Sequence, residues 1–310
     1  MDSQTTSRRE NIGLILRALL AVVLLIVLFQ FVDLSGVGAA FSRAQPAYLL
    51  GALALVFANI GLQMAKWRYF VRLVNPANSN MEIAASLLFG ISLGTITPGQ
   101  LGEFGGRALR HRSLPAGSVV GLTLVDKLQM MCILGIGGAT SLVLLYRPPL
   151  IVGIVIISLV SLAGIFLFFS SMSLVGLVNR LKPTLLEHRL LKEFFESIGI
   201  FKHKDLLVSL ILSVLFYGVL FAQMYLLVNA FEIVSPAAAF LGFAAMMFSK
   251  SLIPISLGDL GVREATSVYF FSLCGVAAST SLSAALLLFV FNILLPSVVG
   301  LLFIPKFTAK

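Results

Sequence analysis

One sequence pattern occurs twice in this chain, and each copy interrupts a long apolar segment. Residues 89–102 read FGISLGTITPGQLG and residues 248–261 read FSKSLIPISLGDLG, so the copies lie 159 residues apart and share Phe, Ser, Leu, Ile, Gly, Leu and Gly in register. Charged residues follow both copies at once. Paired interruptions in matching halves of a membrane transporter typically mark its binding site. The pattern therefore predicts two related halves with a site between them.

Composition places the chain in a membrane. Of its 310 residues 59% are apolar and 11% charged, with a mean hydropathy of +1.03, which is typical of a polytopic membrane protein. The net charge of +9 would suggest nucleic-acid binding in a soluble protein. Here most Lys and Arg lie between apolar segments, where they set topology and attract anionic lipid. We expect no nucleic-acid partner, no metal and no cofactor, and we expect Cys132 and Cys274 to be buried thiols.

Six apolar segments are long enough to cross a hydrocarbon core of about 30 Å. They are residues 12–32, 46–65, 118–145, 150–170, 206–230 and 279–304. Two more segments, 82–112 and 236–275, contain the repeated pattern. Pro98 and Gly99 in one, and Pro254 and Gly258 in the other, would halt a helix, because Pro lacks an N–H group and Gly relaxes the backbone. Each of these segments is predicted to be a helix, a turn and a returning helix.

The distribution of basic residues favours re-entrant hairpins at both interruptions. With a cytoplasmic N-terminus and two hairpins that return to their own side, only Arg43 and Arg147 fall outside, which satisfies the positive-inside bias. Three crossings in each half, 1–147 and 148–310, invert the second repeat relative to the first. We therefore predict an all-α, multi-pass protein of the cell membrane, with about six transmembrane helices, two re-entrant hairpins in two inverted repeats, and both termini cytoplasmic.

Three stretches resemble the lysylphosphatidylglycerol synthase transmembrane, or flippase-like, family. They are TPGQLGE at 97–103 followed by Arg107, LVDKL at 124–128, and IPISLGDLGVRE at 253–264. Two features depart from the family pattern: Asp259 stands where many members have Gly, and Arg107 follows Glu103 by four residues where three is common. The resemblance covers essentially the whole chain. It implies the lipid-translocating region, without the aminoacyltransferase domain that follows it in some relatives.

The residues at the interruptions support an anion site. The returning helices should begin near Gly99 and Gly258, so that their free N–H groups face the membrane interior. Arg107 and Arg263 add guanidinium groups that pair bidentately with phosphate. The residues expected at the substrate site are Thr97, Pro98, Gly99, Gly102, Glu103, Arg107, Asp126, Lys127, Lys250, Ser256, Gly258, Asp259, Gly261, Arg263 and Glu264.

Structural roles remain open for several of these residues. Arg107 with Glu103, and Arg263 with Asp259, have the spacing of ion pairs along one helix. Asp126 and Lys127 are as well suited to joining neighbouring helices as to contacting substrate. Three polar residues in apolar segments are interpreted as interhelical hydrogen-bonding groups rather than ligands. They are Gln63, Asn229 and Asn292.

Three function classes fit these features. The first is a non-enzymatic transporter that flips an anionic lipid, such as an aminoacylated or plain phospholipid or a polyprenyl-phosphate sugar, with proton coupling through Glu103, Asp259 or Glu264. The others are a secondary transporter of small soluble anions and a membrane-embedded transferase acting on lipid-linked substrates. Membrane lipids are the expected partners. The sequence leaves open a homo-oligomer, a separate lipid-modifying enzyme, the identity of the lipid, and the direction of transport.

Overall fold

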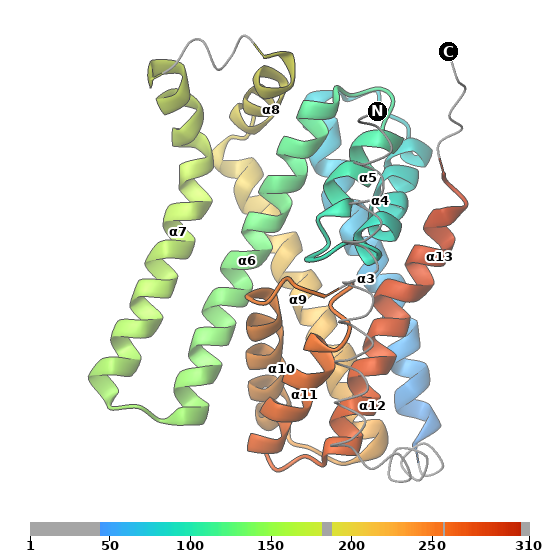
Figure 1. Cartoon of the computed structure of the whole chain (residues 1–310), viewed down its shortest axis with the longest axis vertical. Coiled ribbons are helices and arrows are strands. Elements are labelled where there is room, and N and C mark those ends of the chain that lie inside the picture. The colour runs from blue at the N-terminus through green and yellow to red at the C-terminus, as the bar shows by residue number, and fades with distance from the viewer. Residues whose placement is uncertain (1–43, 182–187, 257, 305–310) are drawn as a thin grey trace, which may run out of the picture.

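The computed structural model describes residues 44–181, 188–256 and 258–304, all of whose regular elements are helices (Figure 1). By length and composition, four helices of this part of the chain can cross a membrane: Pro46–Val74 (α3), Ala116–Tyr146 (α6), His203–Phe231 (α9) and Ala278–Leu301. The last is α12 (Ala278–Phe289), the π-helical turn η2 (Val290–Leu294) and α13 (Leu295–Leu301) in succession. Helices suit this setting because they satisfy their own backbone groups without water.

Four of the six predicted crossing segments lie in these helices. The segment predicted at 150–170 lies in α7 (Leu150–Leu181), which packs mainly against α6 and against α8 (Arg189–Gly199). The segment predicted at 12–32 lies outside the described residues. Two boundaries were wrong. α3 continues to Val74 rather than ending at 65, because its apolar pattern resumes after Lys66, and α7 continues to Leu181 rather than ending at 170. Lys66, assigned from sequence to a cytoplasmic loop, therefore lies within a long helix.

Each interrupted segment forms a helical hairpin. α4 (Asn80–Thr95) pairs with α5 (Gly102–Arg110) towards one end of the molecule, and α10 (Pro236–Ser251) pairs with α11 (Val262–Leu273) towards the other (Figure 1). α4 and α10 each have 16 residues, which makes each about 24 Å long, short of a full crossing. Both begin at a serine N-cap, Ser79 or Ser235, whose side chain accepts a backbone hydrogen bond.

The two hairpin tips have the same backbone conformation and touch each other. Gly99 and Gly258 both have a φ of 56°, and the next residues, Gln100 and Asp259, have φ of 58° and 62°. Gln100 and Asp259 hold equivalent positions in the two copies of the pattern, and Nε2 of Gln100 donates to Oδ2 of Asp259 at 3.0 Å. A contact between equivalent residues is expected where an axis of local twofold symmetry passes. The sequence repeat is therefore also a structural repeat at the tips.

Close contacts fix both hairpins. Gly99 fits because a Cβ there would lie 2.6 Å from the Cβ of Pro254 in the opposite tip. In α6, Gly138 leaves the space that the Phe248 ring fills, and in α13 Gly300 lies directly against the Leu88 carbonyl of α4. Small residues allow helices to approach closely inside membranes, where no hydrophobic driving force acts between them.

Glu82 joins the two chain segments at the end of the first hairpin that lies away from its tip. Its carboxylate accepts hydrogen bonds from the backbone N–H groups of Arg112 at 2.6 Å and Ser113 at 2.9 Å. Burial by itself would raise the pKa of the Glu82 carboxyl, but these hydrogen bonds hold that pKa below its ordinary value of 4.5. Glu82 thus ties the beginning of α4 to the chain that leaves α5.

Candidate functional site

A cavity of about 460 Å³ lies where the two hairpin tips meet. Among the described residues, five basic and three acidic side chains line it, an excess of two positive charges. These are Lys66, Arg107, Lys127, Lys250 and Arg263, with Glu103, Asp126 and Asp259. Charges among apolar helices are costly and usually functional. The cavity is therefore the candidate site.

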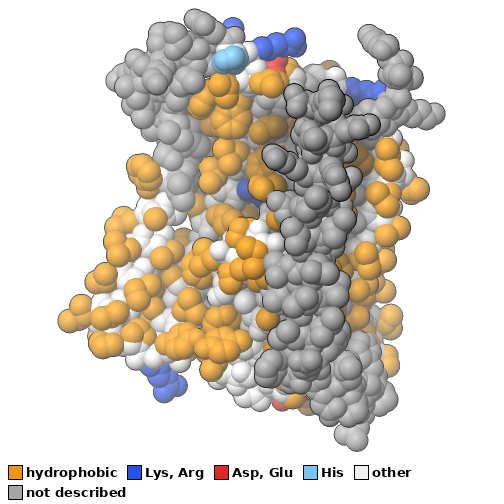
Figure 2. Space-filling view, in the orientation of Figure 1, with side chains coloured by type: hydrophobic (Ala, Val, Ile, Leu, Met, Phe, Trp, Pro, Cys, Tyr) orange, Lys and Arg blue, Asp and Glu red, His pale blue; other side chains and the backbone are white. Residues whose placement is uncertain are grey.

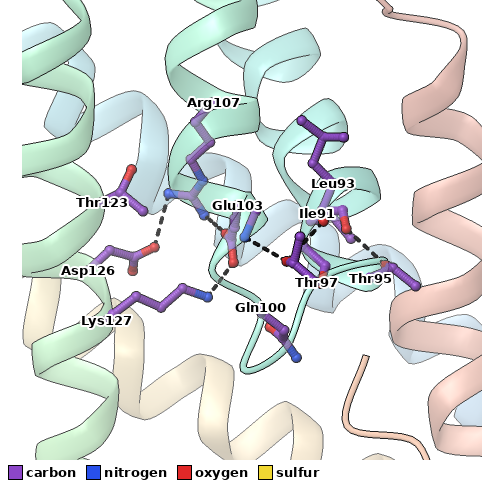
Figure 3. Close-up of polar contacts among 12 residues, drawn as sticks. Ile91, Leu93, Thr95, Thr97, Gln100, Glu103, Arg107, Thr123, Asp126 and Lys127 are labelled. Atoms are coloured by element: carbon purple, nitrogen blue, oxygen red, sulfur yellow. Dashed lines mark hydrogen bonds and ion pairs between the residues drawn. The ribbon is translucent and has the colours of Figure 1, made fainter. Parts of the chain in front are cut away.

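Arg107 is the centre of an ionic network on the first hairpin. One of its terminal nitrogens pairs with the Glu103 carboxylate, and the other lies 3.1 Å from Oδ2 of Asp126 (Figure 3). Lys127 pairs with the second Glu103 oxygen, and Lys66 lies 2.7 Å from Oδ1 of Asp126. Positive and negative groups alternate along this network, which joins α3 and α6 to α5. The ion pair between Glu103 and Arg107 that their spacing allowed is present.

The surroundings of Arg107 make it rigid. Its side chain is 2% exposed, and its guanidinium carbon lies 4.4 Å from the centre of the Trp67 ring. A cation over an indole face is attracted by the ring quadrupole. The Trp67 ring is fixed in turn by a 2.8 Å hydrogen bond from its Nε1 to the Ser86 hydroxyl.

Arg263 on the second hairpin is in a different situation. Its Nη2 donates to the Gly258 carbonyl at 2.6 Å, its guanidinium carbon lies 5.0 Å from the Phe289 ring centre, and no described carboxylate pairs with it. Asp259 instead lies 2.8 Å from Nζ of Lys250. The expected Asp259–Arg263 pair is not formed because α11 begins only at Val262. Asp259 lies in the left-handed turn before it, so the spacing rule for one helix does not apply.

The predicted site residues divide into two groups. Eight line the cavity, namely Gly99, Glu103, Arg107, Asp126, Lys127, Lys250, Asp259 and Arg263. The other seven, Thr97, Pro98, Gly102, Ser256, Gly258, Gly261 and Glu264, are not among the lining residues and lie in the turns and first helical turns of the tips. Several of them hold the turns: the Thr97 hydroxyl accepts from the Gly102 N–H at 2.6 Å, and Glu264 accepts from the Gly261 N–H at 2.7 Å.

The returning helices begin a few residues later than the sequence predicted. α5 and α11 begin at Gly102 and Val262, later than Gly99 and Gly258. At the first tip the leading donors already have partners, since the Glu103 N–H donates to the Gln100 carbonyl at 3.0 Å and the Gly102 N–H to the Thr97 hydroxyl. Basic side chains, rather than backbone donors, supply the positive charge of this cavity.

Sequence reasoning missed several lining residues. Lys66 was placed in a loop, and Gln100 was not singled out, although both line the cavity. Gln63 and Asn292, interpreted as hydrogen-bonding groups between helices, also line it. A signal for Lys66 was available: a lysine in one apolar helix and an aspartate in another, Asp126, are each too costly to bury alone.

Comparison with known families finds one family whose model covers almost the whole chain. Residues 14–300 match the family model described as the lysylphosphatidylglycerol synthase TM region. The chain belongs to this family. Its members are membrane domains associated with lipid-related transport or synthesis. No significant match was found among curated proteins or among solved structures.

Both departures from the pattern of the lysylphosphatidylglycerol synthase TM family lie in the cavity. The four-residue spacing of Glu103 and Arg107 puts both side chains on one face of α5, where they pair. Asp259, where many members have Gly, binds both Lys250 and Gln100.

The cavity reaches the apolar surface of the molecule. Among its lining residues, Leu101 and Met131 are 67% and 47% exposed, and the Lys127 side chain is 33% exposed. Figure 2 shows a basic side chain at a point midway along an otherwise apolar face. A charged cavity that opens among apolar side chains suits an amphipathic ligand.

Proposed function

We propose that this protein moves lipids with an anionic, phosphate-bearing head group across the membrane. The observation that carries the proposal is the cavity between the hairpin tips, with its positive excess and its exposed apolar rim. A phosphate pairs with guanidinium and ammonium groups through charge-assisted hydrogen bonds. Acyl or prenyl tails would remain among the apolar side chains outside while the head group occupies the cavity.

The proposal includes a topology of six crossings and two re-entrant hairpins. It is supported by the length of α4 and α10, by the approach of the hairpins from opposite ends (Figure 1), and by the tip contact between Gln100 and Asp259. Two inverted hairpins around a shared site suit alternating access. The end that carries the α3–α4 connection would be cytoplasmic because α8, which carries Arg189 and Lys192, lies at the same end and the positive-inside bias counts Lys and Arg residues.

Cysteine labelling tests this topology. In the α3–α4 connection Ala77 is exposed, whereas its neighbour Asn78 is buried, so Ala77 is the better position for a labelled cysteine. Exposed Ala237, at the start of α10, is the labelling position at the opposite end. In a background without Cys132 and Cys274, Ala77→Cys should react with an impermeant maleimide from the cytoplasm and Ala237→Cys from outside. Reaction of both from one side would contradict the inverted arrangement.

Carboxylates pair with the cations that would bind phosphate. Glu103 and Asp126 hold Arg107, and Asp259 holds Lys250. An arriving phosphate would exchange with these tethered anions, and its negative charge would offset part of the positive excess of the cavity lining. Proton coupling, as part of the proposal, would act at Glu103, because protonation there would release Arg107. Glu264 is buried but does not line the cavity.

A reconstituted transport assay tests the function. Proteoliposomes would carry a phosphatidylglycerol whose head group can be oxidised from outside, so that movement between leaflets is measured directly. Arg263→Ala should abolish movement, and Arg263→Lys should restore it only in part, since an ammonium lacks the planar fork. Arg189→Ala is the matched control, because that side chain is 88% exposed on α8. Wild-type rates in Arg263→Ala would refute the proposed role of the cavity.

The same vesicles separate the alternatives. Uptake of inorganic phosphate without lipid movement would indicate a transporter of soluble anions. A covalently altered lipid, detected by mass spectrometry, would indicate a transferase. Lipid movement with neither phosphate uptake nor an altered lipid supports the proposal. The exposed apolar rim at Leu101 and Met131 favours that outcome.

A further inference from the structure

Uncharged amide side chains lie in the same cavity as the ionic network. Asn59, Gln63 and Asn292 all line it. Nε2 of Gln63 donates to Oδ1 of Asn59 at 2.6 Å, and Nδ2 of Asn59 donates to Oε1 of Gln223 at 3.5 Å. Gln223 donates to the Ala52 carbonyl at 3.0 Å, so the chain of hydrogen bonds ends on the backbone of α3. Gln63 is the first donor in this series of hydrogen bonds. Its own side-chain oxygen, Oε1, accepts none of them.

Asn292 has an acceptor without a partner. Its Nδ2 donates to the Leu288 carbonyl at 3.3 Å, while its Oδ1 is buried and has no hydrogen-bond partner. A buried acceptor left unpaired costs about 1–3 kcal/mol. Such groups are rare in native proteins and call for a ligand, a water or a functional explanation.

The backbone around Asn292 is also irregular. Residues Val290–Leu294 form a single π-helical turn, and Pro296 follows, which cannot donate the N–H that an α-helix would direct to the Asn292 carbonyl. Isolated π-turns inside helices occur frequently at functional sites. Since η2 packs beside α3, Asn292 and Gln63 lie on neighbouring elements that both line the cavity.

The charge of the cavity limits which hydrogen-bond donors of a ligand can bind to these amide oxygens. An amide oxygen accepts from a hydroxyl or from an ammonium group. An ammonium would enter a cavity whose described lining already carries two more positive than negative charges, and like charges repel strongly where water is scarce. A hydroxyl has no such penalty.

From these contacts we propose that the head group combines a phosphate with an uncharged, hydroxyl-bearing group, and that Asn292 and Gln63 bind the hydroxyls. The inference rests on the proposed function and narrows its substrate class. A glycerol phosphodiester and a polyprenyl-phosphate sugar share this chemistry, whereas a cationic aminoacyl lipid does not. The cavity would thus exclude a lysylated head group by charge.

Trp67 provides the binding signal. It is the only tryptophan in the sequence, and its ring faces the Arg107 guanidinium, so exchange of a carboxylate for a phosphate at Arg107 should change its emission. The purified full chain in detergent would be titrated with four lipids: phosphatidylglycerol, phosphatidylmethanol, lysyl-phosphatidylglycerol and a polyprenyl-phosphate hexose. Phosphatidylmethanol keeps the phosphodiester but has no free head-group hydroxyl.

Phosphatidylglycerol should bind about tenfold more tightly than phosphatidylmethanol, as expected for one or two hydrogen bonds, and lysyl-phosphatidylglycerol should bind more weakly than either. Asn292→Leu should bring the first two lipids within about twofold of each other without weakening phosphatidylmethanol. Gln63→Leu serves the same purpose if Asn292→Leu does not fold. Asn292→Asp should improve binding of the lysylated lipid, because it adds a negative charge. Comparing the affinity for the polyprenyl-phosphate hexose with that for phosphatidylglycerol shows whether the cavity prefers the hydroxyls of a sugar or those of glycerol.

Two results would overturn this inference: equal wild-type affinity for phosphatidylglycerol and phosphatidylmethanol, or tighter binding of the lysylated lipid. Both differ from a failure of the proposed function, in which none of the three anionic lipids changes Trp67 emission and none moves between leaflets.

Discussion

Arg107→Ala should destabilise the protein far more than Arg263→Ala, although both remove an arginine from the same cavity. Arg107 holds the buried carboxylate of Glu103 and the partly buried carboxylate of Asp126. Removing one partner of a buried ion pair costs about 3–5 kcal/mol. Both carboxylates keep a lysine partner, Lys127 or Lys66, so the lower end of this range, about 3 kcal/mol, is expected.

Arg263 contributes less to folding because no described carboxylate depends on it. Its removal deprives the Gly258 carbonyl of a donor and ends the contact with the Phe289 ring. A loss of about 1–2 kcal/mol follows from one hydrogen bond and one weak ring contact. Arg263→Ala should therefore remain folded while losing transport, which makes it the cleaner test of anion binding.

Reversible unfolding in mixed micelles of increasing sodium dodecyl sulfate measures the difference. Helicity from circular dichroism should follow unfolding, and Trp67 emission provides a second probe beside Arg107. The cost of Arg107→Ala should shrink in a Glu103→Gln/Asp126→Asn background, where no carboxylate is left unpaired. Equal stability of Arg107→Ala and wild type, or an undiminished cost in that background, would refute the reasoning.

Three smaller perturbations test other contacts. Gly99→Ala should lower stability by about 1–2 kcal/mol, because the left-handed backbone and the opposite tip leave no place for a Cβ. Gly105→Ala is the control and should not lower stability, because a Cβ at that position would have no neighbour within 4 Å. Lys250→Met should slow lipid movement by leaving Asp259 without its cation, and adding Asp259→Asn should recover folding stability in the unfolding assay. The depressed pKa of Glu82 means that its contribution is complete above the ordinary pKa of 4.5 and is lost as pH falls through the lower folded-state value. Wild type should therefore lose more stability than Glu82→Gln when the pH is lowered from neutral into that range. If the stability of both proteins changes equally with pH, the Glu82 carboxylate does not stabilise the fold through its hydrogen bonds to Arg112 and Ser113.

Local chemistry explains why the sequence located the helix breaks well. Pro98 and Gly99 stop α4, and the equivalent turn stops α10, because proline and glycine act on the backbone within one or two residues. The 159-residue repeat predicted matching turns, and the matching φ values of Gly99 and Gly258 confirm them. The family match over residues 14–300 confirms the resemblance inferred from the motifs.

Boundaries and partners were less predictable where the deciding neighbour is distant in sequence. The end of α3 was placed too early because Lys66 reads as a loop residue when its partner Asp126 is not considered. Asn292 reads as a hydrogen-bonding group between helices, and only the packing of η2 beside α3 shows that its oxygen is unpaired in the cavity.

The sequence by itself determined that this is a helical membrane protein with two broken segments that share one pattern and are followed by charge. Apolar length, proline and glycine act locally, so they can be read without the fold. Only the tertiary structure decided which charges pair. Asp259 pairs with Lys250 rather than Arg263 because a left-handed turn separates it from α11, and Gln100 reaches Asp259 because the two tips meet. Ion pairs depend on distances of a few ångströms, and those distances are set by how hairpins from opposite ends pack together.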